Sequence, residues 1–129
     1  MIKKLIAIIL LATSSAYADP ALTAQSWLVA DSNGKILEGS NTTEIRSIAS
    51  ITKLMTAMVV LDSGQSLTEV IPKKLYNKQL TRETLIDLAI VKSDNNAAKM
   101  LCDYYPGGYN SCVEAMNQKA VALQMTNSV

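Results

Sequence analysis

Ser50 and Lys53, three residues apart, are the pair in this sequence best suited to nucleophilic chemistry. The 129 residues contain no histidine, so a serine nucleophile here must be activated by a lysine, a carboxylate or an amine. At this spacing in a helix, the two side chains share one face about one turn apart and the amine can reach the hydroxyl. At a helix N-terminus, Ser50 would also lie beside free backbone N–H groups that suit an oxyanion. The pair therefore predicts acyl transfer by a lysine-activated serine.

The Ser-x-x-Lys spacing is a weak signal by itself. Ser32 and Lys35 have the same spacing, but they lie at a predicted hairpin turn, where no helical face aligns them. Ser50 could also be a simple helix N-cap, with Lys53 as a solvated residue of the first turn. Both interpretations of Ser50 stay open on this evidence.

A second polar cluster consists of Ser93, Asp94 and Asn95, between an apolar run and a further predicted helix. A hydroxyl and an amide at such a corner can project into a cleft. The simpler interpretation is a group of capping residues, because Ser, Asp and Asn are preferred at helix N-termini. Together with Ser50 and Lys53, the cluster matches Ser-x-x-Lys and Ser-Asp-Asn, two of the three motifs of penicillin-interacting serine enzymes.

The elements that would position these residues begin with a hairpin and a helix. Residues 26–30 and 35–38 are short apolar-rich runs on either side of Asp-Ser-Asn-Gly, and Asn-Gly at such a place predicts an antiparallel hairpin. A helix is expected from about Ser50 to a stop at residues 62–64. Because this helix is apolar nearly all round, we expect it to be central and buried.

The remaining chain is expected to be mainly helical. Residues 67–71 predict a short strand, and Thr81 is expected to cap a helix that contains the apolar run 85–91. Two further helices are expected over residues 96–103 and 111–123, separated by a Pro-Gly-Gly break.

The N-terminus predicts export. A basic start, the apolar run 5–11 and the Ala-x-Ala sequence at 16–18 are typical of a secretory signal peptide over residues 1–18. The apolar run is well short of the roughly 20 residues that a membrane-spanning helix needs. We therefore expect a protein of the periplasm or cell envelope whose mature chain is residues 19–129.

Charge and cysteine content limit the partners. The 12 basic and 11 acidic residues give a formal net charge of +1, without the basic excess of a nucleic-acid binder. The lack of histidine excludes His-based zinc and haem sites, and no cofactor or metal is expected. In an exported chain Cys102 and Cys112 more readily form a disulfide than a metal or redox site, with two free buried thiols as the alternative.

The segment around Ser50 resembles the nucleophile segment of the serine D-alanyl-D-alanine carboxypeptidases, the low-molecular-mass penicillin-binding proteins. Residues 46–57, Arg-Ser-Ile-Ala-Ser-Ile-Thr-Lys-Leu-Met-Thr-Ala, carry this resemblance. Residues 27–38 resemble the opening hairpin of the family, residues 93–98 its Ser-x-Asn segment, and residues 116–127 the helix and turn that follow. The resemblance implies an α/β (α+β) fold of the β-lactamase/transpeptidase type. Residues 19–129 would be a partial domain with the hairpin and helical cluster, without the C-terminal sheet strands.

The resemblance also implies roles for the site residues. Ser50 would attack the peptide bond between the two D-alanines of a peptidoglycan pentapeptide, and Lys53 would take its proton. Ser93 would relay a proton to the departing D-alanine, and Asn95 would hold the substrate amide. Water would release the acyl-enzyme, whereas β-lactams would act as covalent inhibitors through a longer-lived ester. Membrane association stays open.

One motif of the family is missing, which keeps two other functions open. Lys-Thr-Gly, which in the family binds the substrate carboxylate and supplies one oxyanion-hole N–H, does not occur in the sequence. Loss of one such donor typically costs roughly 100- to 1,000-fold in rate, so an impaired enzyme is expected. A non-catalytic envelope protein that binds muropeptides or a partner is one alternative. A class A β-lactamase-like hydrolase is the other, although no Glu-x-x-Leu-Asn deacylation motif is present.

Overall fold

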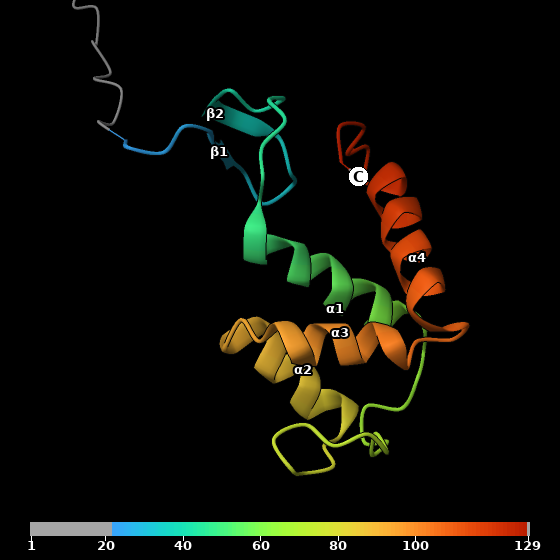
Figure 1. Cartoon of the computed structure of the whole chain (residues 1–129). Coiled ribbons are helices and arrows are strands. Elements are labelled where there is room, and N and C mark those ends of the chain that lie inside the picture. Colours follow the sequence, from blue (N-terminus) through green and yellow to red (C-terminus); the bar gives the residue numbers. More distant parts are fainter. Residues whose placement is uncertain (1–21, 129) are drawn as a thin grey trace, which may run out of the picture. The chain divides into compact units, whose positions relative to one another are not determined.

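The computed structural model describes residues 22–128, and the predicted signal peptide at residues 1–18 lies outside this range. A two-stranded hairpin precedes a cluster of helices (Figure 1), which confirms the expected mixed fold class. The chain divides into two compact units at Thr42/Thr43, so the hairpin and the helices are described separately. The elements are β1 (Trp27–Ala30), β2 (Ile36–Ser40), the 3-10 helix η1 (Ala49–Ile51), α1 (Thr52–Asp62), α2 (Arg82–Val91), α3 (Asn95–Asp103) and α4 (Gly108–Ala122).

The hairpin forms where the Asn-Gly signal predicts it. Strands β1 and β2 pair antiparallel, with one irregularity of register after Val29. The turn is fixed by Asp31, whose Oδ1 accepts hydrogen bonds from the backbone N–H groups of Asn33 and Lys35, both at 2.9 Å. Ser32 lies in this turn, so the second Ser-x-x-Lys sequence is not on a helix.

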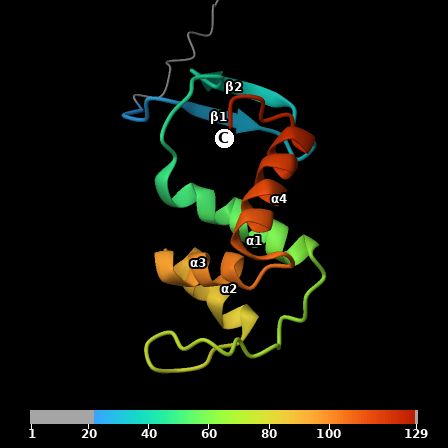
Figure 2. The ribbon, with the colours of Figure 1, turned by 45° about the vertical axis from the view of Figure 1, so that its right-hand side comes forward.

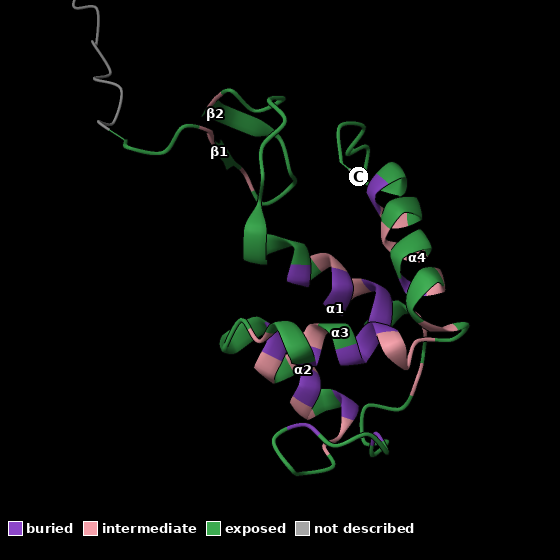
Figure 3. Cartoon of the chain, in the orientation of Figure 1, coloured by how far each residue is buried: buried purple, intermediate pink, exposed green. Residues whose placement is uncertain are grey.

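Helix α1 is the centre of the second unit. It contacts α2, α3 and α4, and α2 also packs against α3 (Figures 1 and 2). The face of α1 toward these helices is buried (Figure 3), whereas Leu54 and Leu61 are each 52% exposed. The expected central, buried helix is thus central, but among the described residues it is buried on one side only, because its neighbours in this unit cover that side.

The core of the helical unit has two parts. A larger cluster joins α1, α2, α3 and the loop before α2, and consists of Val60, Ile71, Leu75, Leu85, Ala89, Ala97, Met100 and Leu101. A smaller cluster of Val59, Cys102 and Cys112 links α1, α3 and α4. These clusters fix the faces that α1 and α3 turn toward each other, and the candidate site lies at that junction.

The segment before α2 differs from the prediction. Residues 67–71 form no regular strand; a single bridge joins Val70 to Thr81, with backbone hydrogen bonds to residues 80–83, and the pairing ends where α2 begins at Arg82. Ile71 instead anchors the loop, because its side chain is fully buried. Arg82 is also fully buried, and its guanidinium pairs with the Glu69 carboxylate at 2.5 Å. This segment is therefore held by core contacts, an ion pair and backbone hydrogen bonds to residues 80–83.

The helix boundaries follow local capping. The hydroxyl of Thr81 accepts the backbone N–H of Thr84 at 3.2 Å, which confirms the predicted cap of α2. Helix α4 begins at Gly108, earlier than the predicted Ser111, after Gly107 with φ of +83°. A Cβ at Gly107 would lie 2.4 Å from the Ser111 hydroxyl, so this turn requires glycine. Within residues 22–128, every helix is too short or too polar to cross a bilayer.

Candidate active site

Ser50 and Lys53 lie where a 3-10 turn runs into α1. Ser50 is the middle residue of η1 and Lys53 is the second residue of α1. The Lys53 Nζ donates a hydrogen bond to the Ser50 Oγ at 3.1 Å, as the three-residue spacing predicts. The capping interpretation of Ser50 is wrong, because Ile48 and Ile51 occupy the cap positions of η1 and α1. Lys53 is not a solvated residue either, since it is only 9% exposed.

Ser93 completes a triangle of polar atoms with this pair. Its Oγ donates to the Ser50 Oγ at 2.6 Å and accepts from the Lys53 Nζ at 3.3 Å. We call the Ser50 Oγ, the Lys53 Nζ and the Ser93 Oγ the hydroxyl–amine triangle. The fold thus brings together two residues of the η1–α1 junction and one from a segment that is 43 residues further along the chain.

The backbone at both sides of the triangle is left-handed. Ala49, directly before Ser50, has φ of +45°, and Ser93 has φ of +54°. Such conformations are unfavourable for residues other than glycine and persist only where the surroundings hold them; they are common at functional sites. They set the directions from which the two hydroxyls meet.

Asp94 and Asn95 have different neighbours from Ser93. Asp94 is the N-cap of α3, and its Oδ1 accepts the backbone N–H groups of Asn96 and Ala97 at 2.8 and 3.0 Å. The capping interpretation of the polar cluster therefore holds for Asp94, whereas the hydroxyl of Ser93 meets Ser50. Asn95, the first residue of α3, lines the same pocket as Lys53.

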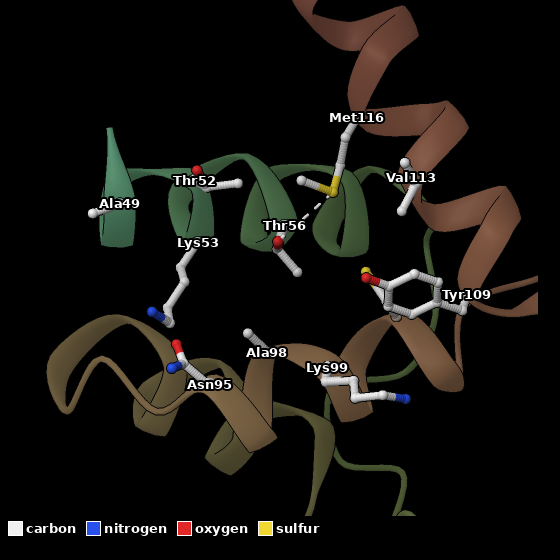
Figure 4. A pocket seen from close by; sticks show the side chains of 11 residues that line it. Ala49, Thr52, Lys53, Thr56, Asn95, Ala98, Lys99, Tyr109, Val113 and Met116 are labelled. Atoms are coloured by element: carbon white, nitrogen blue, oxygen red, sulfur yellow. Dashed lines mark hydrogen bonds between the residues drawn. The ribbon is translucent and has the colours of Figure 1, made fainter. Parts of the chain in front are cut away.

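A pocket of about 270 Å³ lies beside Lys53, between α1, α3 and α4. In Figure 4 the Lys53 side chain points from α1 toward Asn95 on α3, and Tyr109 and Met116 extend from α4. Thr56 on α1 donates a hydrogen bond to the Met116 sulfur at 3.7 Å. Lys53, whose Nζ contacts the Ser50 Oγ, thus borders a space with both polar and apolar walls, a part of the site that sequence spacing did not reveal.

A disulfide supports one side of this pocket. Cys102 on α3 and Cys112 on α4 are joined, with their Cα atoms 5.2 Å apart. Both cysteines are buried, and Cys102 also lines the pocket. The expected pairing is present in the structure, and it ties together the two helices that form the pocket with α1.

An aromatic residue outside the motifs contacts the Ser-Asp-Asn segment. The Tyr76 hydroxyl donates to the Asp94 Oδ2 at 2.5 Å. This bond is the main reason why the pKa of Asp94 is lowered, followed by the backbone N–H of Ala97; the charge of Lys53 also contributes. The same bond is the main cause that raises the pKa of Tyr76. No pattern in the sequence indicates this contact, because the two residues are 18 positions apart and Tyr76 lies in a loop.

The triangle has the parts that nucleophilic catalysis requires. A hydroxyl that is hydrogen-bonded to a buried amine can lose its proton to that amine when the amine is neutral, and it then attacks a carbonyl carbon. The second hydroxyl touches both groups and offers a path for the proton. This chemistry is acyl transfer from an ester, amide or lactam.

Comparison with known proteins matches this chemistry. The family model described as D-alanyl-D-alanine carboxypeptidase matches residues 13–74 and 66–129. A D-alanyl-D-alanine endopeptidase of Pseudomonas aeruginosa is 44% identical over 122 residues, which cover 83% of this chain and 39% of that protein. A D-alanyl-D-alanine endopeptidase of Escherichia coli is 36% identical over 132 residues, which cover 91% of this chain and 43% of that protein.

A third relative has the carboxypeptidase name. The D-alanyl-D-alanine carboxypeptidase DacD of Escherichia coli is 32% identical over 133 residues, which cover 84% of this chain and 34% of that protein. The chain therefore spans less than half of the length of each of these relatives. Because the family model matches nearly the whole sequence, including the segments that contribute Ser50, Lys53 and Ser93, this chain belongs to the D-alanyl-D-alanine carboxypeptidase family.

Proposed function

We propose that this chain carries the nucleophile of a serine D-alanyl-D-alanine carboxypeptidase that acts on peptidoglycan stem peptides. The observation that carries the proposal is the hydroxyl–amine triangle, in which the Ser50 Oγ lies 3.1 Å from the Lys53 Nζ and 2.6 Å from the Ser93 Oγ. The family membership supports the substrate class, since its members are named for the D-alanyl-D-alanine bond.

The reaction would proceed in two steps. Lys53, as a neutral amine, takes the proton of Ser50 while the Ser50 Oγ forms a bond to the carbonyl carbon of the penultimate D-alanine. The C–N bond then breaks, and Ser93 passes a proton to the departing amine of the last D-alanine. Water afterwards attacks the Ser50 ester, and its proton returns through the same groups. Asn95 is proposed to hold the backbone amide of the substrate in the pocket beside Lys53.

The developing oxyanion would be stabilised from one side by the backbone N–H of Ser50, since the N–H groups of Ile51 and Thr52 already donate to the carbonyls of Ile48 and Ala49. Lys-Thr-Gly, the element that would supply the second donor and bind the terminal carboxylate, does not occur in these 129 residues. Since one donor is worth roughly 100- to 1,000-fold in rate, we expect acylation by this chain alone to be slower by at least that factor than in an enzyme with both donors. Such a rate is still measurable with a β-lactam, which forms an ester on the same serine.

A second candidate is an endopeptidase that cuts cross-links. Two of the relatives, at 44% and 36% identity, are named D-alanyl-D-alanine endopeptidases. Both candidates acylate Ser50 with a D-alanyl group, and they differ in the leaving group. Release of free D-alanine from a pentapeptide indicates a carboxypeptidase, whereas conversion of cross-linked muropeptide dimers to monomers indicates an endopeptidase; mass spectrometry of the products separates the two.

Such substrates lie outside the cytoplasm, which suits the signal peptide predicted over residues 1–18. We therefore propose export to the periplasm or cell envelope. Mass spectrometry of the protein secreted by the native host should show a mature N-terminus at Asp19. Retention of Met1 would contradict the export proposal.

The test of the proposed function is labelling by a fluorescent penicillin. Wild-type protein and the matched control Ser32→Ala should be labelled, whereas Ser50→Ala should not be labelled. The control removes the serine of the other Ser-x-x-Lys sequence. A stable label also argues against a β-lactamase, which would hydrolyse the probe. A folded wild-type protein that takes no label, but retains muropeptides in a pull-down, would refute the enzyme and favour the non-catalytic alternative.

A further inference from the structure

Tyr76 lies outside the sequence motifs, yet it contacts the segment that supplies Ser93. We infer that Tyr76 is a positioning residue: it holds Asp94 and thereby fixes the Ser93 hydroxyl in the hydroxyl–amine triangle. The inference deepens the proposed function and rests on it for the reactivity of Ser50. Three observations carry it: the turn that presents Tyr76, the contact with Asp94, and the backbone of Ser93.

The turn is built to present residue 76. Leu75 and Lys78 exchange two backbone hydrogen bonds, at 2.9 and 3.0 Å, and enclose Tyr76 and Asn77. Tyr76 and Asn77 have φ of +53° and +63°, the two left-handed residues of a tight hairpin turn. Asparagine suits this backbone, whereas tyrosine does not. Leu75 is buried in the larger core cluster, so the turn is anchored to the helical unit.

Tyr76 holds its place through its hydroxyl. The residue is 64% exposed, so burial of the ring contributes little. Its hydroxyl donates to the Asp94 Oδ2 at 2.5 Å, a charge-assisted hydrogen bond of the stronger kind. The lowered pKa of Asp94 and the raised pKa of Tyr76 have this bond as their largest cause. The unfavourable backbone of this exposed aromatic residue thus coincides with a strong polar contact of its hydroxyl to Asp94, with a weaker interaction with the Asn96 side chain beside it.

Asp94 links the Tyr76 contact to the backbone of Ser93, the residue directly before it. Its Oδ1 accepts two backbone N–H groups of α3, and its own N–H donates to the Leu88 carbonyl at 3.0 Å. The Tyr76 bond occupies the second carboxylate oxygen, so Asp94 is held from α2, α3 and the turn. Ser93 directly precedes this residue at φ of +54°, a conformation that its surroundings must maintain. Without the Tyr76 bond, Asp94 can move, and the backbone of Ser93 can then leave its left-handed conformation. Its hydroxyl would move away from Ser50 and Lys53.

The test uses a variant that removes one oxygen atom. Tyr76→Phe deletes the hydroxyl, and Tyr105→Phe is the matched control, because that tyrosine packs against the core and does not line the pocket. Asp94→Asn is the conservative variant, since it keeps an oxygen for α3 and an amide for the Tyr76 hydroxyl. Two quantities are measured: the rate constant for acylation of Ser50 by benzylpenicillin, and the NMR amide shift and HN–Hα coupling of Ser93, which report its φ.

In Tyr76→Phe we expect acylation to slow by about 10-fold, because a small displacement of a proton-transfer group is costly. The Ser93 signals should shift, and the melting temperature should fall by about 4 to 8 °C, because one hydrogen bond with a net contribution of about 1 kcal/mol is lost. Tyr105→Phe should match wild type, and Asp94→Asn should retain most of the rate. Rate and signals are measured well below the melting temperature of the variant, where it is fully folded, so a loss of stability alone would leave both unchanged and the pattern separates positioning from stability.

Unchanged Ser93 signals in Tyr76→Phe would overturn the inference, whatever the rate does, since a slower rate would then mean direct contact with the ligand. Shifted signals with a wild-type rate would also overturn it. If the wild-type protein is never acylated, the proposed function fails by itself. The Ser93 signals alone then decide the positioning role: a shift that is confined to Tyr76→Phe supports it, and no shift refutes it.

Discussion

Replacing Lys53 with methionine removes the amine of the hydroxyl–amine triangle and keeps most of its apolar stem. Lys53 is only 9% exposed, and its Nζ donates to two neutral hydroxyls, those of Ser50 and Ser93. The substitution therefore tests whether this amine contributes to stability or to catalysis. The proposed mechanism predicts a small change in the free energy of unfolding and a large decrease in the acylation rate.

The effect on stability should be small. Two hydrogen bonds are lost, each with a net contribution of about 1 kcal/mol. In return, the folded protein no longer carries a largely buried amine, whose burial costs a similar amount or more when it is charged. The hydroxyls of Ser50 and Ser93 keep their mutual bond at 2.6 Å. We expect the free energy of unfolding to change by less than about 1 kcal/mol in either direction.

The effect on chemistry should be large. General base catalysis contributes about 100- to 10,000-fold, which corresponds to about 2.7 to 5.5 kcal/mol of activation free energy. The assay is the acylation rate constant with benzylpenicillin, measured beside a urea unfolding curve. Lys35→Met is the matched control, because it alters the other Ser-x-x-Lys sequence in the hairpin turn. Acylation of folded Lys53→Met within threefold of the wild-type rate would refute Lys53 as the base.

Three further predictions concern stability and pH. Replacing Cys102 and Cys112 with alanine opens a loop of 10 residues and should lower the free energy of unfolding by about 2.5 to 3 kcal/mol in urea; equal curves with and without the disulfide would contradict this. Arg82→Ala removes a fully buried, ion-paired guanidinium and should cost about 3 kcal/mol in the same assay, with a loss below about 1 kcal/mol as the refuting result. The Asp94 pKa is lowered in the folded state, so its contribution to stability is present above the unfolded pKa and is lost as the pH falls through the folded pKa. In Tyr76→Phe the Asp94 pKa should rise toward the usual 3.8, and the titration can be measured from the ¹³C chemical shift of the Asp94 carboxyl. An unchanged titration would contradict the Tyr76 hydrogen bond as the main cause of the lowered pKa.

The features that could be predicted from sequence are those set by near neighbours in the chain. The Lys53–Ser50 contact follows from helical spacing, and the Thr81 cap follows from its side chain and the N–H groups just after it. The hairpin depends on the Asn-Gly turn in the same way. Each of these needs only a few residues in a row, so local geometry was sufficient.

The features that were missed depend on distant partners. The bond of Tyr76 to Asp94 and the pairing of Arg82 with Glu69 span 18 and 13 positions, and no periodicity marks them. The strand expected at residues 67–71 is reduced to one bridge, because the segment with which it pairs continues into α2 at Arg82, which the composition of residues 67–71 does not indicate. The one-sided burial of α1 likewise reflects which elements pack beside it.

The central claim is that Ser50 is the residue that becomes acylated. The most direct measurement is intact-mass spectrometry after incubation with benzylpenicillin, followed by peptide mapping of the adduct. We predict one penicilloyl group per chain, attached to the peptide that contains Ser50, in wild type and in Ser32→Ala. The adduct should be absent in Ser50→Ala. An unmodified wild-type protein whose circular dichroism shows it to be folded, or an adduct on another residue, would contradict the account.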